Sequence, residues 1–252
     1  MYDATEAGGK KSAHGIAITN AMQLVEKGLG GRAPAGEAHD EMLAVGLLAT
    51  FARFNHSCAP NTYGSWRDLD GEMVVYALRD IAQGEELVHA YSYNVVSSPR
   101  AVRQQLLQQW HMQCQCSACS QAGSDLAFSD KARAALLMRC CSMGIQRLPT
   151  GRDFQDLADE VRRAMELIDR DPVQGIQMAM EADALVDMEL HGNPHLKEGL
   201  YSRGYELAVL GGRGDLAAEL LSSAYGQCCH AEGYDSPRAS KYRGLLDTTR
   251  SG

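Results

Sequence analysis

The stretch FNHSCAPN, residues 54–61, places an asparagine, a histidine, a serine and a cysteine in direct succession and ends on a second asparagine. It follows the largely apolar run LLATFARF, residues 47–54, so hydrogen-bonding and metal-binding side chains gather where the chain enters a core. Two interpretations are open here: a capped turn with an incidental cysteine, or a functional site. The choice between them depends on a second cluster further along the chain.

This second cluster, CQCSAC, contains Cys114, Cys116 and Cys119. Thiolates at this spacing can surround one tetrahedral Zn²⁺ at roughly 2.3 Å per bond. The alternative, a cysteine-rich loop without a metal, would expose three reactive thiols. The spacing also suits a metal site better than a disulfide framework, which favours a reducing cytosolic or nuclear compartment.

A closed tetrahedral site needs a fourth ligand. A histidine or one of the remaining cysteines is available, and these cysteines are Cys58, Cys140, Cys141, Cys228 and Cys229. The two adjacent pairs fall within segments of helical periodicity, where cysteine more often packs as a small apolar side chain. Cys58 lies in the dense polar stretch and is therefore the predicted fourth ligand.

The overall composition is that of a globular protein, with 252 residues, of which 45% are hydrophobic and 22% charged. No apolar run approaches the roughly 20 residues that cross a bilayer, and the first residues lack the pattern of a secretory signal, so no membrane partner is expected. The net charge of −8 disfavours direct binding of nucleic acid, because phosphate binding needs clustered lysine and arginine. An acidic surface would suit a basic protein substrate.

Two short strands are predicted after the polar stretch. Residues 71–78, GEMVVYAL, predict the first strand, and a turn at Gly84 leads into a second that ends in VHAYSY. Alternation along this second strand predicts that Leu87, His89 and Tyr91 share one face.

A helix is predicted to follow these strands, with Ser98 as its N-cap and Pro99 at its first helical position. Val102, Leu106 and Trp110 recur every four residues. This spacing predicts an apolar stripe that packs against the strands.

Helical periodicity dominates after the composition changes near residue 121. About six helices are predicted from residue 129 onward, over 129–144, 152–169, 173–190, 194–210, 214–231 and 236–247. In the fifth, Ala217, Leu221 and Ala224 match the small-large-small spacing of the second helix of a tetratricopeptide repeat. Near the start, the Gly-rich segment 28–37 predicts a loop, because it has no preceding strand and does not match the dinucleotide fingerprint.

Three elements in this order, FNHSCAPN, GEELVHAYSY and WHMQCQCSAC, resemble the SET-domain protein-lysine methyltransferases, especially the SET-and-MYND subfamily. The helical tail resembles the C-terminal helical domain of that subfamily. The resemblance implies an α+β fold. In this fold, a partial SET-type β fold is followed by a zinc-bound segment and then by an all-α domain. Residues 1–97 would be the C-terminal part of a SET domain, 98–120 a post-SET helix and zinc segment, and 121–252 a helical, tetratricopeptide-like domain.

The resemblance also implies two binding sites. Asn55 and His56 fall on the family's Asn-His pair, which holds S-adenosylmethionine, and Met112 falls where the family contacts the cofactor. Asn20 is matched to a further polar residue near the family's cofactor. Cys58 falls on the cysteine that completes the structural zinc site with Cys114, Cys116 and Cys119.

The remaining implied roles concern the reaction. Tyr91 matches the catalytic tyrosine at the mouth of the methyl-transfer channel, and Tyr93 and Trp110 match walls of the substrate channel. An apolar, aromatic channel suits this chemistry because desolvation lowers the pKa of a lysine amine, which must be neutral to accept the methyl group. Taken alone, each of these residues has an ordinary structural explanation. Their occurrence together with Cys58 and the cysteine cluster favours a methyl-transfer site.

The family's Gly-x-Gly element and MYND insert are not found in the sequence, so the first strands of the SET domain are expected to be missing. The predicted function is S-adenosylmethionine-dependent protein-lysine N-methyltransferase, acting on a histone or non-histone protein in the cytoplasm or nucleus. The alternative is a truncated or inactive SET-like protein that acts as a zinc-braced, helical-repeat interaction module and binds a peptide partner.

Overall fold

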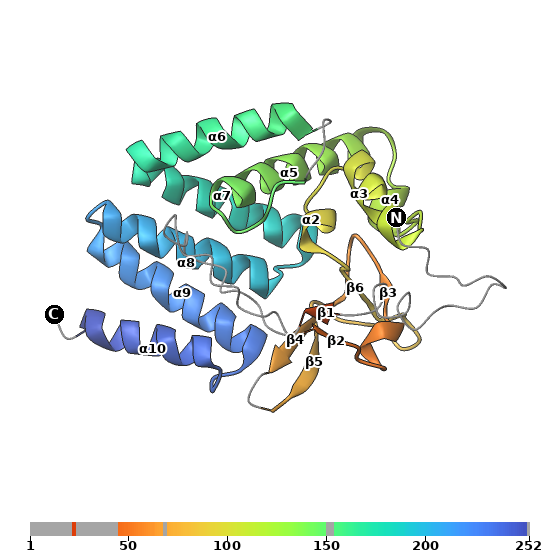
Figure 1. The fold of residues 1–252 in the computed structure, drawn as a ribbon, viewed down its shortest axis with the longest axis horizontal. Helices are drawn as coiled ribbons and strands as arrows, with labels where there is room; N and C mark the ends of the chain where they lie inside the picture. Colours follow the sequence, from red (N-terminus) through yellow and green to blue (C-terminus); the bar gives the residue numbers. More distant parts are fainter. Residues whose placement is uncertain (1–21, 24–44, 68–69, 150–153, 251–252) are drawn as a thin grey trace.

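The computed structural model describes residues 22–23, 45–67, 70–149 and 154–250. A small β region comes first in these residues, followed by short helices and then by a stack of long helices (Figure 1). Asn20 and the predicted loop 28–37 lie outside the described residues.

Within the described residues, the β region contains three strand pairs. Strands β1 (Met22–Gln23) and β2 (Val45–Gly46) pair antiparallel, and β4 (Thr62–Arg67) and β5 (Glu72–Ala77) form an antiparallel hairpin. Strands β3 (Asn55–His56) and β6 (Val88–His89) pair in parallel. The first predicted strand is therefore confirmed by β5. The parallel pair is important for the site because it joins the polar stretch to the segment that carries Tyr91.

The predicted face of the second strand is wrong at one position. His89 is buried, but Leu87 is 44% exposed. Regular strand pairing begins at Val88, whose N–H donates to Oδ1 of the buried Asn61 at 2.9 Å. Because a side-chain amide holds the chain here, the residues before Val88 do not follow the alternation of a paired strand.

A short 3₁₀ helix, η1 (Phe51–Arg53), closes the β region over β4. Phe51 is 4% exposed, and its ring lies against Gly64 of β4. A Cβ atom at position 64 would lie 2.5 Å from Cε2 of Phe51, so the close approach of ring and strand requires glycine.

Gly64→Ala is accordingly expected to destabilise the protein by about 1–3 kcal/mol, because the Phe51 ring must move in a packed core. Urea unfolding of both proteins measures the difference. Gly226→Ala is the matched control: it lies on an exposed face of a helix with open space around it, and is expected to stabilise by about 0.5–1 kcal/mol. Equal unfolding free energies for wild type and Gly64→Ala would contradict the packing described.

Short helices connect the β region to the helical stack: α2 (Tyr93–Val96), α3 (Arg100–Leu107), η2 (Gln108–Trp110) and α4 (Ser117–Ser120). The predicted helix start was wrong by one residue, since Pro99 rather than Ser98 is the N-cap of α3. The hydroxyl of Ser98 instead donates to the carbonyl of Asn94, one turn back in α2. Because its hydroxyl is engaged in this bond, Ser98 does not cap α3.

The predicted apolar stripe of α3 is also displaced. Val102 and Leu106 are half-buried, whereas Arg103 and Leu107 are fully buried. Leu107 packs in a cluster with Cys58, Val95 and the cysteine segment (residues 111–120). The stripe differs from the prediction because the buried residues of α3, Arg103 and Leu107, contact the cysteine segment.

The six predicted long helices are all present and make up the upper and left parts of the view in Figure 1. They are α5 (Gly123–Ser142), α6 (Gln155–Arg170), α7 (Pro172–Leu190), α8 (Pro194–Leu210), α9 (Gly214–Glu232) and α10 (Pro237–Arg250). The largest difference is at α5, which begins before the predicted residue 129. Among the helices of the described residues, none combines the length and apolar character needed to span a membrane.

The helical core runs between neighbouring helices, with α8 packed against α7 and α9. The cysteine pairs Cys140/Cys141 and Cys228/Cys229 are buried in these apolar clusters, as predicted. The β region is attached to the end of α9, because the hydroxyl of Tyr63 donates to the carbonyl of His230 at 3.1 Å and Nε of Arg67 donates to the carbonyl of Glu232 at 3.3 Å. These bonds hold the β4–β5 hairpin against the helical stack.

Candidate functional site

The structure brings the four predicted cysteines together. The sulfurs of Cys58, Cys114, Cys116 and Cys119 all lie within 4.8 Å of one another. Sγ of Cys58 is 3.9 Å from Sγ of Cys114 and 3.6 Å from Sγ of Cys119. A tetrahedral ion with metal–sulfur bonds of about 2.3 Å would place its sulfurs about 3.8 Å apart. The four side chains therefore fit a tetrahedral metal ion.

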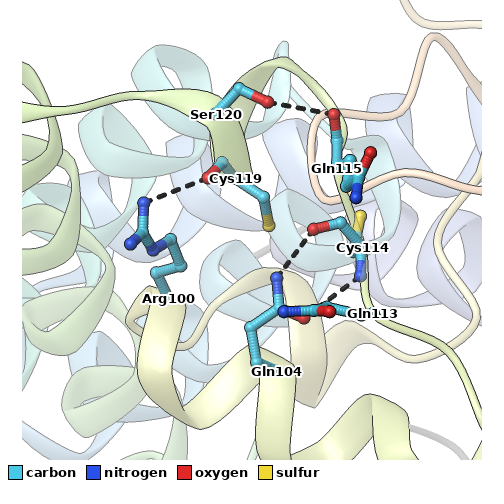
Figure 2. A pocket seen from close by; sticks show the side chains of 7 residues that line it. All are labelled: Arg100, Gln104, Gln113, Cys114, Gln115, Cys119 and Ser120. Atoms are coloured by element: carbon cyan, nitrogen blue, oxygen red, sulfur yellow. Dashed lines mark hydrogen bonds between the residues drawn. The ribbon is translucent and has the colours of Figure 1, made fainter.

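Backbone and side-chain hydrogen bonds hold these sulfurs in place. The N–H of Cys58 donates to Sγ of Cys116 at 3.3 Å. The amide of Gln104 in α3 bonds both backbone groups of Cys114, donating to its carbonyl at 2.8 Å and accepting from its N–H at 3.1 Å (Figure 2). The hydroxyl of Ser120 donates to the carbonyl of Gln115 at 3.0 Å. The hydrogen bonds of Gln104 join the cysteine segment to α3.

A polar cavity of about 230 Å³ lies beside this cluster. Figure 2 shows the side chains that line it. Its lining residues are Arg100, Gln104, Gln113, Cys114, Gln115, Cys119 and Ser120. The guanidinium of Arg100 donates to the carbonyls of Cys119 and Gln121, each at 3.1 Å. Arg100 therefore supports the backbone around the cysteines.

The sulfurs are strongly coupled to one another. Hydrogen bonding with Cys114 is the main cause that raises the pKa of Cys58 and that lowers the pKa of Cys116. Four thiolates at these separations would repel one another unless a cation lay among them.

A buried arginine lies against the same cluster. Arg103 of α3 is 0% exposed, and its guanidinium donates to Sγ of Cys119 at 3.8 Å and to the carbonyl of Ser98 at 2.8 Å. Its nearest carboxylate in the described ion pairs is Asp130, at 3.9 Å. A divalent ion with four thiolates carries a net charge of −2, and the buried positive charge of Arg103 compensates part of it. Nothing in the sequence pattern had marked Arg103.

A second buried arginine connects the cluster to the helical stack. Arg133 of α5 is 1% exposed and donates to the carbonyl of Cys58 at 2.9 Å and to the carbonyl of Val96. Its Nε forms an ion pair with Oε2 of Glu189 in α7 at 2.8 Å. One side chain therefore joins the polar stretch, α2 and two long helices. Arg133 was not identified from the sequence.

Arg133→Met is expected to destabilise the protein by about 3–5 kcal/mol, because it removes the positive charge that pairs with the buried carboxylate of Glu189 and the donor to the carbonyl of Cys58. Chemical denaturation measures the loss. The double variant Arg133→Met/Glu189→Met should recover much of it, since no buried charge is then left unpaired. A single variant within about 0.5 kcal/mol of wild type would show that the ion pair does not stabilise the junction.

Tyr91 lies at the centre of an aromatic group next to the cysteine cluster. Its ring centroid is 5.2 Å from that of His56, 5.2 Å from that of His89 and 5.5 Å from that of Trp110. Its hydroxyl donates to the carbonyl of Phe54 at 3.2 Å. Burial raises the pKa of Tyr91, so its hydroxyl keeps the proton at neutral pH. Residues from β3, β6 and η2 thus meet around one phenol.

Both histidines of this group are neutral at physiological pH. Burial is the main cause that lowers the pKa of His56 and of His89, each to about 4. Nδ1 of His56 accepts a hydrogen bond from the backbone N–H of Tyr91 at 3.1 Å. Its Nε2 lies 3.2 Å from Sγ of Cys58.

The two asparagines of the polar stretch differ in their environment. Asn55 is exposed, and its amide donates to Oε1 of Glu86 at 2.6 Å. Asn61 is 1% exposed and donates to Oε1 of Glu85 at 3.0 Å and to the carbonyl of Glu86 at 2.8 Å. Asn55 is therefore accessible to a ligand, whereas Asn61 fixes the loop before β6. Neither glutamate nor Asn61 was among the predicted site residues.

The other predicted residues do not all join this group. Tyr93, at the start of α2, stacks on His195 of α8 with ring centroids 5.3 Å apart, and it packs against the helical core. Met112 is half-buried against the cluster that contains Cys58 and Leu107. Trp110 reaches both this cluster and Tyr91.

Comparison with known proteins is consistent with this geometry. Residues 22–92 match the SET domain family. Human protein-lysine N-methyltransferase SMYD4 is 28% identical over 144 residues, which are 50% of this chain and 18% of that protein. The histone-lysine N-methyltransferase set5 of Schizosaccharomyces pombe is 33% identical over 75 residues, 30% of this chain and 23% of that protein. Histone-lysine N-methyltransferase ATXR2 of Arabidopsis thaliana is 39% identical over 74 residues, 29% of this chain and 15% of that protein.

The chain therefore carries a SET domain, with a mostly helical region after it. The SMYD4 relatives are protein-lysine N-methyltransferases, and the chain is similar to this SET-and-MYND type, as the sequence predicted. It spans less than a quarter of the length of the three relatives named above.

Proposed function

We propose that this chain is the part of an S-adenosylmethionine-dependent protein-lysine N-methyltransferase that holds the catalytic tyrosine. The observation that carries the proposal is the position of Tyr91, which is surrounded by His56, His89 and Trp110 directly beside the Asn-His pair. Such an aromatic surround excludes water and lowers the pKa of an entering lysine amine, which keeps the amine neutral.

The residues of this group would have distinct roles. S-adenosylmethionine, when bound, supplies a methyl group on a sulfonium. The exposed amide of Asn55, the backbone of His56 and the side chain of Met112 would bind it, as would Asn20, which lies outside the described residues. Trp110 and Tyr93 would line the path of the substrate lysine.

Tyr91 would orient the amine. Its hydroxyl donates to the carbonyl of Phe54, so its oxygen lone pairs remain able to accept a hydrogen bond from the amine. This bond would turn the nitrogen lone pair toward the methyl carbon. The amine nitrogen would take the methyl group while the sulfonium is released as a thioether, and the methylated ammonium would lose its extra proton to water.

We further infer that the metal is Zn²⁺ and that its role is structural. Four thiolates in a tetrahedral set suit zinc or an iron–sulfur centre, and zinc matches the separations of the sulfurs of Cys58, Cys114 and Cys119. By fixing the cysteine segment, the site would hold Trp110 against Tyr91. The chemistry of methyl transfer itself needs no Lewis acid.

The substrate would be a lysine of a histone or non-histone protein, methylated in the nucleus or the cytoplasm. Two of the named relatives are histone-lysine methyltransferases. The net charge of −8 suits a basic substrate protein.

The helical region supports a second candidate function, the binding of a peptide by a tetratricopeptide-like domain. Three apolar residues on one face of α7 are exposed: Val173 by 45%, Met180 by 44% and Met188 by 51% of their surface. Exposed apolar side chains along one helix face suit an apolar peptide. Met180→Glu should then abolish capture of peptides from an array while methyl transfer continues; unchanged capture would refute this second function.

The proposed activity is tested with labelled S-adenosylmethionine, core histones and a lysate of unmethylated proteins. Label should appear on lysine side chains with wild type and fall at least tenfold with Asn55→Ala, since each bond to a charged ligand contributes about 1.5–3 kcal/mol. Gln174→Ala on the exposed face of α7 is the control and should retain full activity. Absence of cofactor-dependent label with the full-length, metal-loaded protein would refute the proposal.

A further inference from the structure

The imidazole of His56 makes contact with two different parts of the site. Nδ1 accepts from the backbone N–H of Tyr91 at 3.1 Å, and Nε2 lies 3.2 Å from Sγ of Cys58. The ring is thus a single rigid group between a sulfur of the metal cluster and the backbone of the tyrosine.

The first of these bonds determines the direction of the second. A backbone N–H donates to Nδ1, so Nδ1 carries no proton, and in a neutral imidazole the proton must be on Nε2. Nε2 is therefore the donor and Sγ of Cys58 the acceptor. A metal-bound thiolate is a better acceptor than a thiol, so the tautomer set by Tyr91 suits the metal-loaded state of Cys58.

Few movements are open to this imidazole. His56 is 6% exposed, and its strand pairs in parallel with β6, where His56 is opposite His89. The next residue, Ser57, donates its N–H to the carbonyl of His89 at 3.0 Å. The backbone of His56 and Ser57 is held by β6, and the buried ring has little room to change rotamer. A shift of Cys58 would therefore move the imidazole and, through its bond to the N–H of Tyr91, the tyrosine.

We propose that His56 is a positioning residue that couples metal occupancy of the four-cysteine site to the placement of Tyr91, with Nε2–H donated to Cys58 and Nδ1 accepting from Tyr91. The assignment rests on the proposed function for the role of Tyr91. It adds a task for the His56 side chain beyond the backbone contact with the cofactor.

Three variants of His56 test its bond to Cys58 and its bond to Tyr91 separately. His56→Asn places a carbonyl near the position of Nδ1 and loses the donor to Cys58, whereas His56→Gln places an amide N–H near the position of Nε2 and loses the acceptor for Tyr91. His56→Phe keeps the ring and loses both bonds. Each full-length variant is loaded with Zn²⁺ or Co²⁺ and compared with wild type.

Two readouts that are independent of activity are expected to give opposite patterns. Metal affinity, measured by competition with a chelator, should fall about tenfold in His56→Asn and His56→Phe and stay near wild type in His56→Gln. Amide hydrogen exchange at Tyr91 should accelerate in His56→Gln and His56→Phe and stay slow in His56→Asn. In the methyl-transfer assay, kcat should fall in His56→Gln with the KM for the cofactor unchanged.

The imidazole tautomer gives a further check on wild type. ¹⁵N spectra of the zinc-loaded protein should show the Nε2–H form of His56, and an Nδ1–H form or an imidazolium would overturn the proposal. Equal metal affinities for wild type, His56→Asn and His56→Phe would overturn it as well. If affinity and exchange follow the expected pattern while wild type transfers no methyl group, the link stands and the methyltransferase assignment fails.

Discussion

Removal of the metal ion by a strong chelator is expected to abolish methyl transfer and to unfold the cysteine segment while the helical stack stays folded. Structural zinc sites contribute apparent binding free energies of about 10–16 kcal/mol in small domains, which is comparable to the whole stability of many proteins. The apolar clusters of the long helices do not include Cys58 or the cysteine segment. Far-ultraviolet circular dichroism should therefore keep most of the helical signal while the near-ultraviolet signal of Trp110 changes.

The same loss is expected from Cys116→Ser, with metal content measured by mass spectrometry of the purified protein. Cys140→Ala is the matched control, because Cys140 is fully buried in the helical core and lies outside the metal cluster. It should lower the thermal midpoint modestly and keep a full complement of metal. A Cys116→Ser protein that retains its metal and activity would contradict the assignment of the four-cysteine site.

Tyr91→Phe is expected to lower kcat by about 10²-fold or more, because loss of one oriented hydrogen-bonding group at the reacting centre is typically of that size. The ring remains among His56, His89 and Trp110, so the binding of cofactor and metal should stay near wild type. Loss of the bond to the carbonyl of Phe54 should reduce stability by about 0.5–1.5 kcal/mol. Steady-state kinetics at saturating cofactor measures the effect.

Tyr93→Phe serves as the comparison, since the ring of Tyr93 stacks on His195 of the helical stack. Its effect on kcat should be much smaller, within about tenfold of wild type. Equal losses in the two variants would mean that the hydroxyl of Tyr91 has no special part in the reaction.

Much of this site follows from local sequence because its residues occur in dense, unusual groups. Cys58 lies in a polar stretch after an apolar run, and the three later cysteines share one short segment, so chemistry alone pointed to their meeting. The long helices were predictable for a different reason. Gly, Pro and Asp turns interrupt a clear helical periodicity, and boundaries such as Pro194–Leu210 matched the prediction.

The parts that escaped prediction depend on contacts between distant segments. Arg133 and Arg103 are buried although arginine is usually exposed, and no local pattern distinguishes them from surface residues. Their burial follows from carbonyls and sulfurs contributed by other segments. The position of Ser98 was missed similarly, because its hydroxyl bonds back to Asn94 in a short helix that the sequence did not indicate.

We expect this site to bind S-adenosylmethionine beside Tyr91, and calorimetric titration of the full-length, metal-loaded protein measures that binding. Binding should be saturable with one cofactor per chain, weakened at least tenfold by Asn55→Ala and retained by Tyr91→Phe. An absence of binding heat at all cofactor concentrations, confirmed by equilibrium dialysis, would contradict it.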